Sequence, residues 1–598
     1  MTQTTAPLDV YSDRLAFRQR LERSLSRRDK TLSLLRLVVF LIGAILFTEI
    51  VGHRRVELPW LLLPMLAFAG LVGLHSRVLR SLAQTRRAVE FYGKVIGRLN
   101  DDWMGKGFSG QEYLETKHPC ADDLDLFGKG SLFELLCTAK TRVGQETLAA
   151  WLLEPADRET VLDRQKAVDE LRDRLDLRED LAKLVGDPSE FADPKQLAVW
   201  TVKPPVFLRP FERLAMLMLS AVSILAVVMA LQQRFHPLFL MLVLVVHYFC
   251  LRTLKKRTQP IAQGVSEVCR GLKSYSEVLR RLEREKCESP LLRDLLARLV
   301  REEVRASSQI RRLDQWVKLL EDGEKNMVFI PFAFLLFWPV HVSCLIERWR
   351  QTNGPYIVGW IRSVGEMEAL CSLAGVAFER PDDTFPEIVE TGPVFEAQAI
   401  GHPLIPDKKC VRNDVALGDK ARLLIISGSN MSGKSTFLRT VGSSAVLAFA
   451  GGAVRAKKLR LSTMQIAASI QLRDSIQRGV SRFYVEITRI RDMLEGAKPY
   501  PPLLFLVDEI FQGTNSYDRR VAAEAIVRKL LEKGAFGLIT THDLALARIV
   551  DTLEGLGENV HFEDTVVGEE LHFDYKLRPG VVAKGNALHL LRSIGLDL

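Results

Sequence analysis

The feature that most constrains the fold is a glycine-containing loop between an apolar run and a helix-like segment. The run "RLLIIS", Arg422 to Ser427, predicts a buried strand, and "TFLRTVGSSAVLAFA" after the loop predicts an amphipathic helix. Glycine lets the backbone curl so that its N–H groups point at phosphate oxygens, and a helix N-terminus adds partial positive charge. The pattern GxxxxGK[ST] is filled by Gly428, Ser429, Asn430, Met431, Ser432, Gly433, Lys434 and Ser435, and Thr436 follows it. We therefore expect an α/β P-loop NTPase domain.

The residue types of this loop also predict its ligands. Lys434 would reach the β- and γ-phosphates of ATP, and the Ser435 hydroxyl would bind Mg²⁺. The expected activity is Mg²⁺-dependent hydrolysis of ATP, with ATP and Mg²⁺ as cofactors.

Two further apolar runs end in polar side chains. "PPLLFLVDEIFQGTNSYD" carries Asp508 and Glu509 at the end of its strand, and "GAFGLITTHD" ends near His542. An acid at such a strand end can hold Mg²⁺, and its neighbour can polarise the attacking water, so we assign Asp508 to the metal and Glu509 to the general base. The strand ends at 427, 507 and 541 should lie side by side. His542 could sense the γ-phosphate or orient water, or be a structural histidine.

Four apolar runs approach the ~20 residues that span a bilayer. They cover residues 37–51, 58–74, 214–231 and 238–251, in two pairs joined by short polar connections. We expect two transmembrane helical hairpins. The alternative is a pair of buried hairpins in a soluble core, although runs this apolar on every face are unusual in water.

Basic residues set the expected orientation, because lysine and arginine are retained on the cytoplasmic side. Those flanking the runs are Arg14, Arg18, Arg20, Arg23, Arg27, Arg28, Lys30, Arg36, Arg77, Arg80, Arg86, Arg87, Arg252, Lys255, Lys256 and Arg257. Only Arg54, Arg55 and Arg234 fall in the two connections. This bias predicts a multi-pass protein of a bacterial-type cytoplasmic membrane with its ATPase domain in the cytoplasm.

A fifth apolar run, Met327 to Ile346, contains Pro331, Pro339 and His341. If it crossed the membrane, the nucleotide site would face away from cytosolic ATP. We therefore expect a buried or membrane-surface helix.

The remaining segments complete three expected domains. Residues 1–99 hold the basic N-terminal segment and first hairpin, residues 100–379 form an all-α domain with the second hairpin inserted, and residues 380–598 form the ATPase domain. Apolar residues at steps of three and four in 259–322 predict long amphipathic helices, and the stretch rich in Pro and Asp after Arg380 predicts a linker.

The net charge and the cysteines do not identify a particular binding partner. The net charge of +9 suits a nucleic acid and an anionic membrane surface equally. The eight cysteines are scattered, without a CxxC pair or zinc-like spacing, so no metal cluster is expected.

These motifs resemble those of the MutS ATPases. "SGSNMSGKSTFLR" is similar to that family's phosphate loop, "LVDEIFQGTNSYD" to its acid pair, and "THD" to its histidine element. "GVSRFYVEITRI", Gly479 to Ile490, resembles its signature segment, which implies that Ser481 reaches the partner's γ-phosphate across a homodimer and that Glu486 supports this segment. "AIGHPLI" at 399–405 and "RNDVAL" at 412–417 resemble the strands beside the nucleotide base.

Upstream the resemblance is weaker and has departures. Residues 124–171 and 366–374 are similar to the opening and closing parts of the MutS helical core domain. A mismatch reader of this family has a Phe-x-Glu wedge, whereas the triplet that starts at Phe385 here lies in the linker; we also expect no C-terminal nuclease domain. Ser432 stands where the family usually has glycine. Mismatch recognition itself is therefore not predicted.

Three functions remain open from the sequence. The first is a membrane-anchored MutS-like ATPase that dimerises and binds DNA through backbone contacts that salt weakens. The second is a membrane scaffold or signalling ATPase without DNA binding. The third, an ABC-type transporter, is disfavoured because the hairpins lack intramembrane charge pairs and "SRFYVEITRI" occupies the place of an LSGGQ-like signature.

Overall fold

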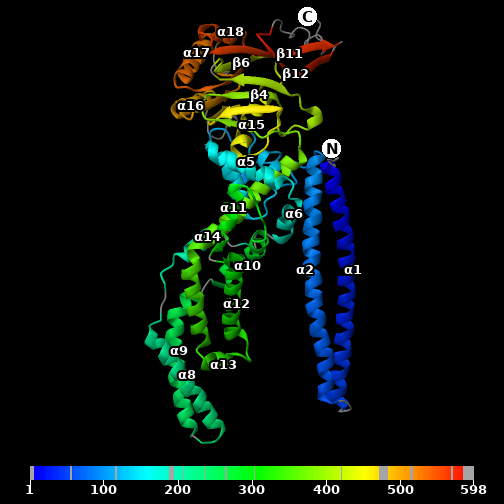
Figure 1. Cartoon of the computed structure of the whole chain (residues 1–598), viewed down its shortest axis with the longest axis vertical. Helices are drawn as coiled ribbons and strands as arrows, with labels where there is room; N and C mark the ends of the chain where they lie inside the picture. Colours follow the sequence, from blue (N-terminus) through cyan, green and yellow to red (C-terminus); the bar gives the residue numbers. More distant parts are fainter. Residues whose placement is uncertain are drawn as a thin grey trace. The chain divides into compact units, whose positions relative to one another are not determined.

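The computed structural model describes residues 6–53, 57–114, 118–186, 191, 194–205, 208–234, 236–262, 265–301, 303–418, 420–470, 482–511, 516–567 and 570–582. The chain forms two compact units. The first comprises residues 1–138, 145–183 and 369–598, and the second comprises residues 139–144 and 184–368. Figure 1 labels their elements along the chain.

The expected domain boundaries after residues 99 and 379 both lie inside the first unit. Arg98 donates hydrogen bonds from Nε to Glu379 Oε2 at 2.5 Å and from Nη2 to Oε1 at 2.6 Å, and both side chains are buried. The end of the first hairpin is thus joined directly to the end of α14 (Trp338–Glu379).

A six-stranded sheet forms the centre of the α/β part of the first unit. Its strand order is β12-β11-β6-β10-β9-β8, parallel except for the β11–β12 pair. The strands are β6 (Leu423–Ser427), β8 (Gln465–Ser469), β9 (Leu503–Val507), β10 (Phe536–Thr541), β11 (Gly557–Val567) and β12 (Glu570–Pro579). Ser427 pairs with Thr541, and Ile539 pairs with Val507. The expectation that these three strand ends lie side by side is confirmed.

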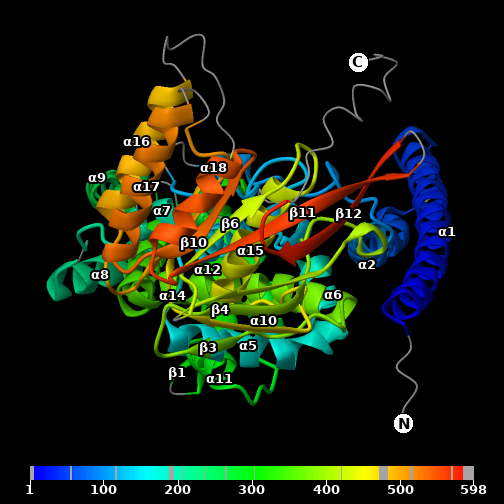
Figure 2. The same ribbon diagram turned by 90° about the horizontal axis from the view of Figure 1, so that it is seen from above.

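Helices cover both faces of this sheet (Figure 2). They are α15 (Lys434–Ala450), α16 (Arg482–Gly496), α17 (Ser516–Glu532) and α18 (Leu544–Ala547). Side chains of Leu503, Phe505 and Val507 enter one core cluster with α16, α17 and α18. Because side chains alternate along a strand, Leu506 faces the other side, where a Cβ on Gly442 of α15 would come within 2.7 Å of its Cδ1.

The helix after the loop differs from the expected amphipathic pattern. Nearly all of α15 is buried, including its serines Ser443 and Ser444. Small residues such as Gly442 allow this close packing, since a Cβ there would also meet Leu124 at 2.5 Å.

A smaller four-stranded sheet has the order β3-β7-β4-β5. Its strands are β3 (Glu387–Val389), β4 (Phe395–Ile400), β5 (Asn413–Leu417) and β7 (Lys458–Ser462). β4 and β5 are antiparallel, and they bring the expected base-side segments 399–405 and 412–417 together.

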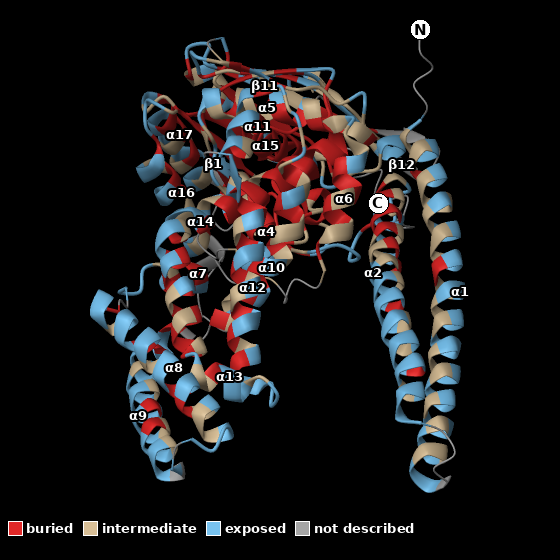
Figure 3. Cartoon of the chain, turned by 60° about the horizontal axis from the view of Figure 1, so that its bottom comes forward, coloured by how far each residue is buried: buried red, intermediate tan, exposed pale blue. Residues whose placement is uncertain are grey.

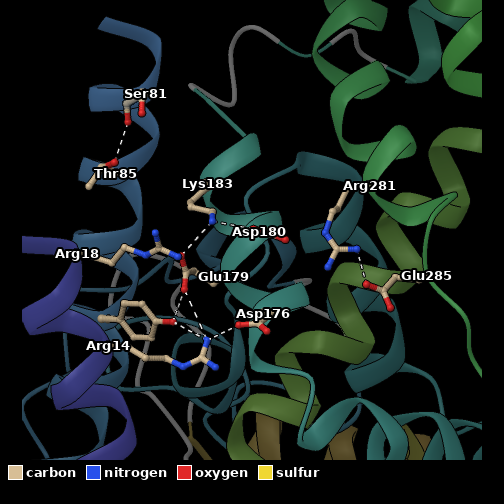
Figure 4. Close-up of polar contacts among 11 residues, drawn as sticks. Arg14, Arg18, Ser81, Thr85, Asp176, Glu179, Asp180, Lys183, Arg281 and Glu285 are labelled. Atoms are coloured by element: carbon tan, nitrogen blue, oxygen red, sulfur yellow. Dashed lines mark hydrogen bonds and ion pairs between the residues drawn. The ribbon is translucent and has the colours of Figure 1, made fainter. Parts of the chain in front are cut away.

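The first hairpin consists of α1 (Pro7–Thr48) and α2 (Leu62–Leu99), which pack along each other. The helices that follow this hairpin along the chain are α3 (Leu132–Leu136), α4 (Arg142–Leu153), α5 (Arg158–Arg172) and α6 (Leu175–Leu184). The buried Glu179 of α6 forms ion pairs with Arg18 at 2.5 Å and Lys183 at 3.1 Å, and it accepts a hydrogen bond from Tyr92 Oη at 2.6 Å (Figure 4). Polar contacts therefore fix the charged half of this hairpin to α6.

The second unit is mostly helical. Its elements are α7 (Pro194–Thr201), α8 (Pro210–Leu231), α9 (Pro237–Ala262), α10 (Val265–Leu282), α11 (Pro290–Ala297), β1 (Val300–Arg301), β2 (Val304–Arg305), α12 (Ala306–Lys325), α13 (Ile330–Leu335) and α14 up to residue 368. The expected helices in 259–322 are present, but the two short strands β1 and β2 interrupt them. The fifth apolar run is divided between α13 and the first turns of α14.

Four helices of the described chain are long and apolar enough to cross a membrane, judged by length and composition. They are residues 7–52, 58–99, 210–231 and 238–261, and their most apolar windows are 0%, 11%, 22% and 6% buried. Figure 3 shows exposed residues along these helices. Within the described residues, the chain does not bury these surfaces in a core of its own.

Candidate nucleotide site

A pocket of about 830 Å³ lies beside the carboxyl end of β6. Eight of the predicted site residues line it, namely Asn430, Met431, Gly433, Lys434, Ser435, Thr436, Asp508 and Glu509. Gly428, Ser429 and Ser432 belong to the same loop, while His542 lies beside Glu509 outside the lining. Ser481 lies outside the described residues.

Lys434 begins α15 and points back into the loop. Its Nζ donates hydrogen bonds to the carbonyls of Gly428 at 2.9 Å and Ser429 at 2.8 Å, and it lies 3.9 Å from Glu509 Oε1. Burial lowers the pKa of Lys434, and the Glu509 and Asp508 carboxylates oppose this effect. The lysine is thus held within the loop and close to the acid that the sequence predicts as general base.

The backbone of the loop requires glycine at Gly433. This residue has a φ of +100°, in the left-handed region, and it is the N-cap of α15. A Cβ at Gly433 would also come within 3.1 Å of the Tyr575 ring. The turn can therefore bring the α15 N-terminus to the pocket without a side chain in the way.

Two hydroxyls of the loop are available to form hydrogen bonds with a phosphate group. Ser429 Oγ and Ser432 Oγ are buried and have no hydrogen-bond partner among the described residues. Buried polar atoms without partners are unfavourable, and phosphate oxygens are acceptors that two hydroxyl donors can satisfy. Together with Lys434 and the α15 N-terminus, these groups fit a polyphosphate.

Asp508 and Glu509 follow β9 at the edge of the pocket. Thr540, on the neighbouring strand β10, donates from Oγ1 to Asp508 Oδ1 and accepts from the Glu509 backbone N–H at 3.0 Å. Glu509 has a φ of +51°, which is uncommon for a residue with a side chain. The threonine fixes both acids, and the unusual turn at Glu509 directs its carboxylate toward Lys434.

His542 lies close to the same acid, since its Nδ1 is 3.7 Å from Glu509 Oε1. Its side chain is 48% exposed. The histidine is therefore neither a buried core residue nor in direct hydrogen-bond contact with the acid.

The other end of the pocket is lined mainly by apolar side chains. Ile400, Ile405 and Val411 contribute to it, together with His402 and Asn413. Burial, and then the charges of Arg439 and Arg455, lower the pKa of His402 to about 4, so this ring is neutral at physiological pH. Lys409 and Cys410 line this end as well, and its apolar side chains offer a surface for the flat ring of a nucleotide base.

Sequence reasoning missed Thr540 and Tyr575. Thr540 had a weak signal, because it is one of two threonines at the end of an otherwise apolar strand. Tyr575 had none, since it lies on β12, the antiparallel edge strand, and reaches the pocket only through the tertiary fold. Its carbonyl accepts a hydrogen bond from Asn413 Nδ2 at 3.0 Å, which ties β12 to β5.

We expect Tyr575→Ala to raise the Kd for ATP by roughly 3- to 30-fold, because the ring lines the pocket against Gly433 and its loss exposes bound nucleotide to water. Tyr575→Phe keeps the ring and should bind ATP as the parent protein does. Titration with a fluorescent ATP analogue would measure both. Equal affinities of the alanine and phenylalanine variants would show that the ring does not contact the nucleotide.

Glu486 of α16 connects the signature-like segment to the acid pair. It is buried, and its carboxylate accepts a hydrogen bond from the backbone N–H of Phe511. Arg519 of α17 donates to the Phe511 carbonyl at 3.1 Å. The turn after Glu509 is thus held from both α16 and α17.

The parallel sheet, the glycine loop and the acids at the neighbouring strand end define a P-loop ATPase domain. Residues 424–597 match the protein family described as MutS domain V. The chain is 36% identical over 206 residues to the endonuclease MutS2 of Thermus thermophilus, covering 34% of this chain and 27% of that protein.

Two DNA mismatch repair proteins give similar matches. MSH3 of Phaeosphaeria nodorum is 32% identical over 242 residues, which is 39% of this chain and 21% of that protein. MutS of Exiguobacterium sp. is 34% identical over 237 residues, or 38% of this chain and 27% of that protein. The alignments thus span about a quarter of the length of these relatives, and the family match, at residues 424–597, lies in the domain that contains the nucleotide site.

Proposed function

We propose that this protein is a membrane-anchored MutS-like ATPase that binds and hydrolyses ATP as a homodimer and acts on DNA. The observation that carries the ATPase proposal is the convergence of Lys434 and Glu509 at 3.9 Å, on adjacent elements of one pocket. A phosphate-binding cation and a carboxylate able to position water are the two groups that phosphoryl transfer to water requires.

Each residue of the site has a separate task. The loop N–H groups and Lys434 bind the triphosphate, and Glu509 accepts a proton from the attacking water and orients it. Thr540 positions both acids through its hydroxyl. Mg²⁺ would be held by Ser435 and Asp508, and it supplies neutralisation of phosphate charge.

Membrane anchoring rests on the two hairpins. Their most apolar windows are at most 22% buried, so long apolar surfaces face outward. Such surfaces are costly in water and stable in a bilayer. The spans 210–231 and 238–261 form one hairpin, and the spans within α1 and α2 form the other.

The polar contacts of α1 support a cytoplasmic ATPase domain. Arg14 forms an ion pair with Asp176 at 2.6 Å, and Arg18 forms one with Glu179 at 2.5 Å, both on α6 of the unit that contains the ATPase sheet. The basic end of the hairpin therefore contacts the unit that contains the nucleotide pocket, which supports retention of both on the cytoplasmic side.

Dimerisation and DNA binding come from the likeness to MutS proteins. By the resemblance to MutS proteins, Ser481 would complete the nucleotide site of a partner chain. Two ATPase domains would therefore face each other in the dimer. DNA contacts would be made to the backbone by Arg and Lys.

The test is ATP hydrolysis by the full-length protein in lipid nanodiscs, with and without duplex or branched DNA. We expect EDTA to abolish hydrolysis, and we expect DNA to stimulate it at low salt and progressively less as salt rises, because phosphate contacts release counterions. If no nucleic acid changes the rate of ATP hydrolysis, DNA is not the partner and the alternative of a protein partner is favoured. Absence of ATP binding at millimolar concentration would refute the ATPase itself.

A further inference from the structure

The segment between α12 and α14 exposes apolar side chains beside the second hairpin. Met327, Val328, Ile330 and Phe332 are exposed, and Phe332 retains 59% of its surface. Figures 1 and 3 show α13 next to the paired helices α8 and α9, and contacts between these three helices agree. An exposed apolar cluster next to candidate membrane helices raises the question of what covers it.

A buried histidine connects α13 to the hairpin. His247 Nε2 lies 2.8 Å from the carbonyl oxygen of Phe334, and Ser223 Oγ lies 2.8 Å from His247 Nδ1. A carbonyl can only accept, so Nε2 carries the proton and Nδ1 accepts from the serine. The Phe334 carbonyl also accepts a hydrogen bond from the Phe337 backbone N–H at 3.2 Å, so the side chain from α9 adds a further donor to it.

The position of His247 gives the depth of α13. It lies roughly ten residues beyond Pro237, the first residue of α9, or about 15 Å along the helix axis. The hydrocarbon core is about 30 Å thick, so Phe334 would lie near its middle if α9 spans it. Within the core, backbone groups must find partners inside the protein, and the Phe334 carbonyl finds them in the Phe337 backbone N–H and the His247 ring.

Basic residues surround a pocket further along α9. This pocket of about 580 Å³ is lined by Arg252, Lys255 and Lys256, and also by Glu324 of α12 and Ser343 of α14. Arg252 and Lys256 follow Pro237 by roughly 15 and 19 residues, or about 22 and 29 Å, so if α9 spans the core Lys256 lies at its far boundary and Arg252 between one and two helical turns inside it. The pocket therefore lies at the level of the lipid headgroups.

The charges of this pocket are unequal. Lys255 forms an ion pair with Glu324 at 2.8 Å. Neither Arg252 nor Lys256 has a carboxylate within ion-pair distance in the part of the chain that the structure describes. Two cations remain for an anion, and the buried Ser343 adds a hydroxyl. Basic pockets between membrane helices on the cytoplasmic side suit anionic headgroups.

We propose that α13 is a re-entrant segment embedded in the cytoplasmic half of the bilayer, and that the pocket of Arg252 and Lys256 binds the phosphate headgroup of an anionic lipid. The inference rests on the proposed membrane anchoring. It explains why the α12–α13 turn is apolar and exposed while its flank is basic, because acyl chains cover the first surface and a headgroup pairs with the second.

Spin labels on the full-length protein in nanodiscs test the depth, with the exposed Cys250 replaced by serine. A label at Phe332→Cys should be accessible to oxygen and shielded from an aqueous nickel chelate, whereas a label at Gln315→Cys on α12 should show the reverse. A label at Leu225→Cys on α8 separates the two proposals. If Leu225 is in lipid but Phe332 is in water, α13 is not re-entrant; if both are in water, the anchoring proposal fails as well.

Lipid selectivity tests the pocket. The protein in phosphatidylcholine vesicles with a minor fraction of phosphatidylglycerol should enrich the anionic lipid around itself, and Arg252→Gln with Lys256→Gln should weaken this preference by roughly tenfold. Arg270→Gln with Arg280→Gln, which removes the same charge from α10, should leave it unchanged. If both double variants lose the preference for anionic lipid equally, the lipid is attracted by the overall positive charge of the protein, and the pocket is not a specific site. Displacement of the lipid by millimolar inorganic phosphate would instead indicate a site for free anions.

Discussion

Replacing Glu509 with glutamine should leave ATP bound and slow its hydrolysis by roughly 10²- to 10⁴-fold, the usual contribution of a general base. Glutamine keeps the size of the side chain and the backbone hydrogen bond to Thr540 but cannot accept a proton from water. It also removes a negative charge 3.9 Å from Lys434, so ATP affinity should be maintained or increased. Single-turnover hydrolysis and equilibrium binding, measured on the same preparation, separate the two effects.

The matched control is Glu558→Gln, an exposed residue at the start of β11 that does not line the pocket. This variant should turn over ATP at the parental rate. If Glu509→Gln also hydrolyses ATP normally, the base must be another group, and His542, 3.7 Å from the same carboxylate, becomes the first candidate. If instead the glutamine variant no longer binds ATP, Glu509 supports the loop rather than the chemistry.

The core of this site was predictable because it depends on local patterns. A glycine loop between a strand and a helix defines the position of Lys434, and acids at the end of a parallel strand must meet that loop at the same sheet edge. The pairing of Ser427 with Thr541, and of Ile539 with Val507, agrees with this rule. The positions of Lys434 and of the two acids could therefore be predicted from short stretches of sequence.

What the sequence did not predict depends on contacts between distant segments. Tyr575 reaches the pocket from the edge strand β12, and no local pattern indicates which way such a strand turns. The burial of α15 on nearly all sides follows from close packing at Gly442 against Leu124, far away in the chain. The expected boundaries after residues 99 and 379 were placed where the composition changes. The first compact unit is defined by contacts between residues on both sides of these boundaries.

Glu379→Ala should destabilise the first unit by about 3–5 kcal/mol, as expected when one partner of a buried ion pair is removed. Glu379 is 2% exposed and accepts two hydrogen bonds from Arg98 and one from Tyr11 Oη at 3.3 Å. Without the carboxylate, the Arg98 guanidinium would remain buried, and among the residues that the structure describes it would keep the Leu135 carbonyl as its acceptor, at 2.7 Å. The apparent unfolding temperature in nanodiscs, at a fixed scan rate, measures the change.

Two comparisons make this prediction specific to the buried pair. Glu390→Ala breaks the exposed ion pair with Arg158 in the same unit and should change stability little. The double variant Arg98→Met with Glu379→Leu removes both charges, so it should be more stable than Glu379→Ala alone. If Glu379→Ala behaves like Glu390→Ala, the hairpin does not depend on this pair. If the single variant is destabilised and the double variant recovers, the unpaired charge is the cause, because the double variant lacks every hydrogen bond that the single variant lacks and also the bond from Arg98 to the Leu135 carbonyl.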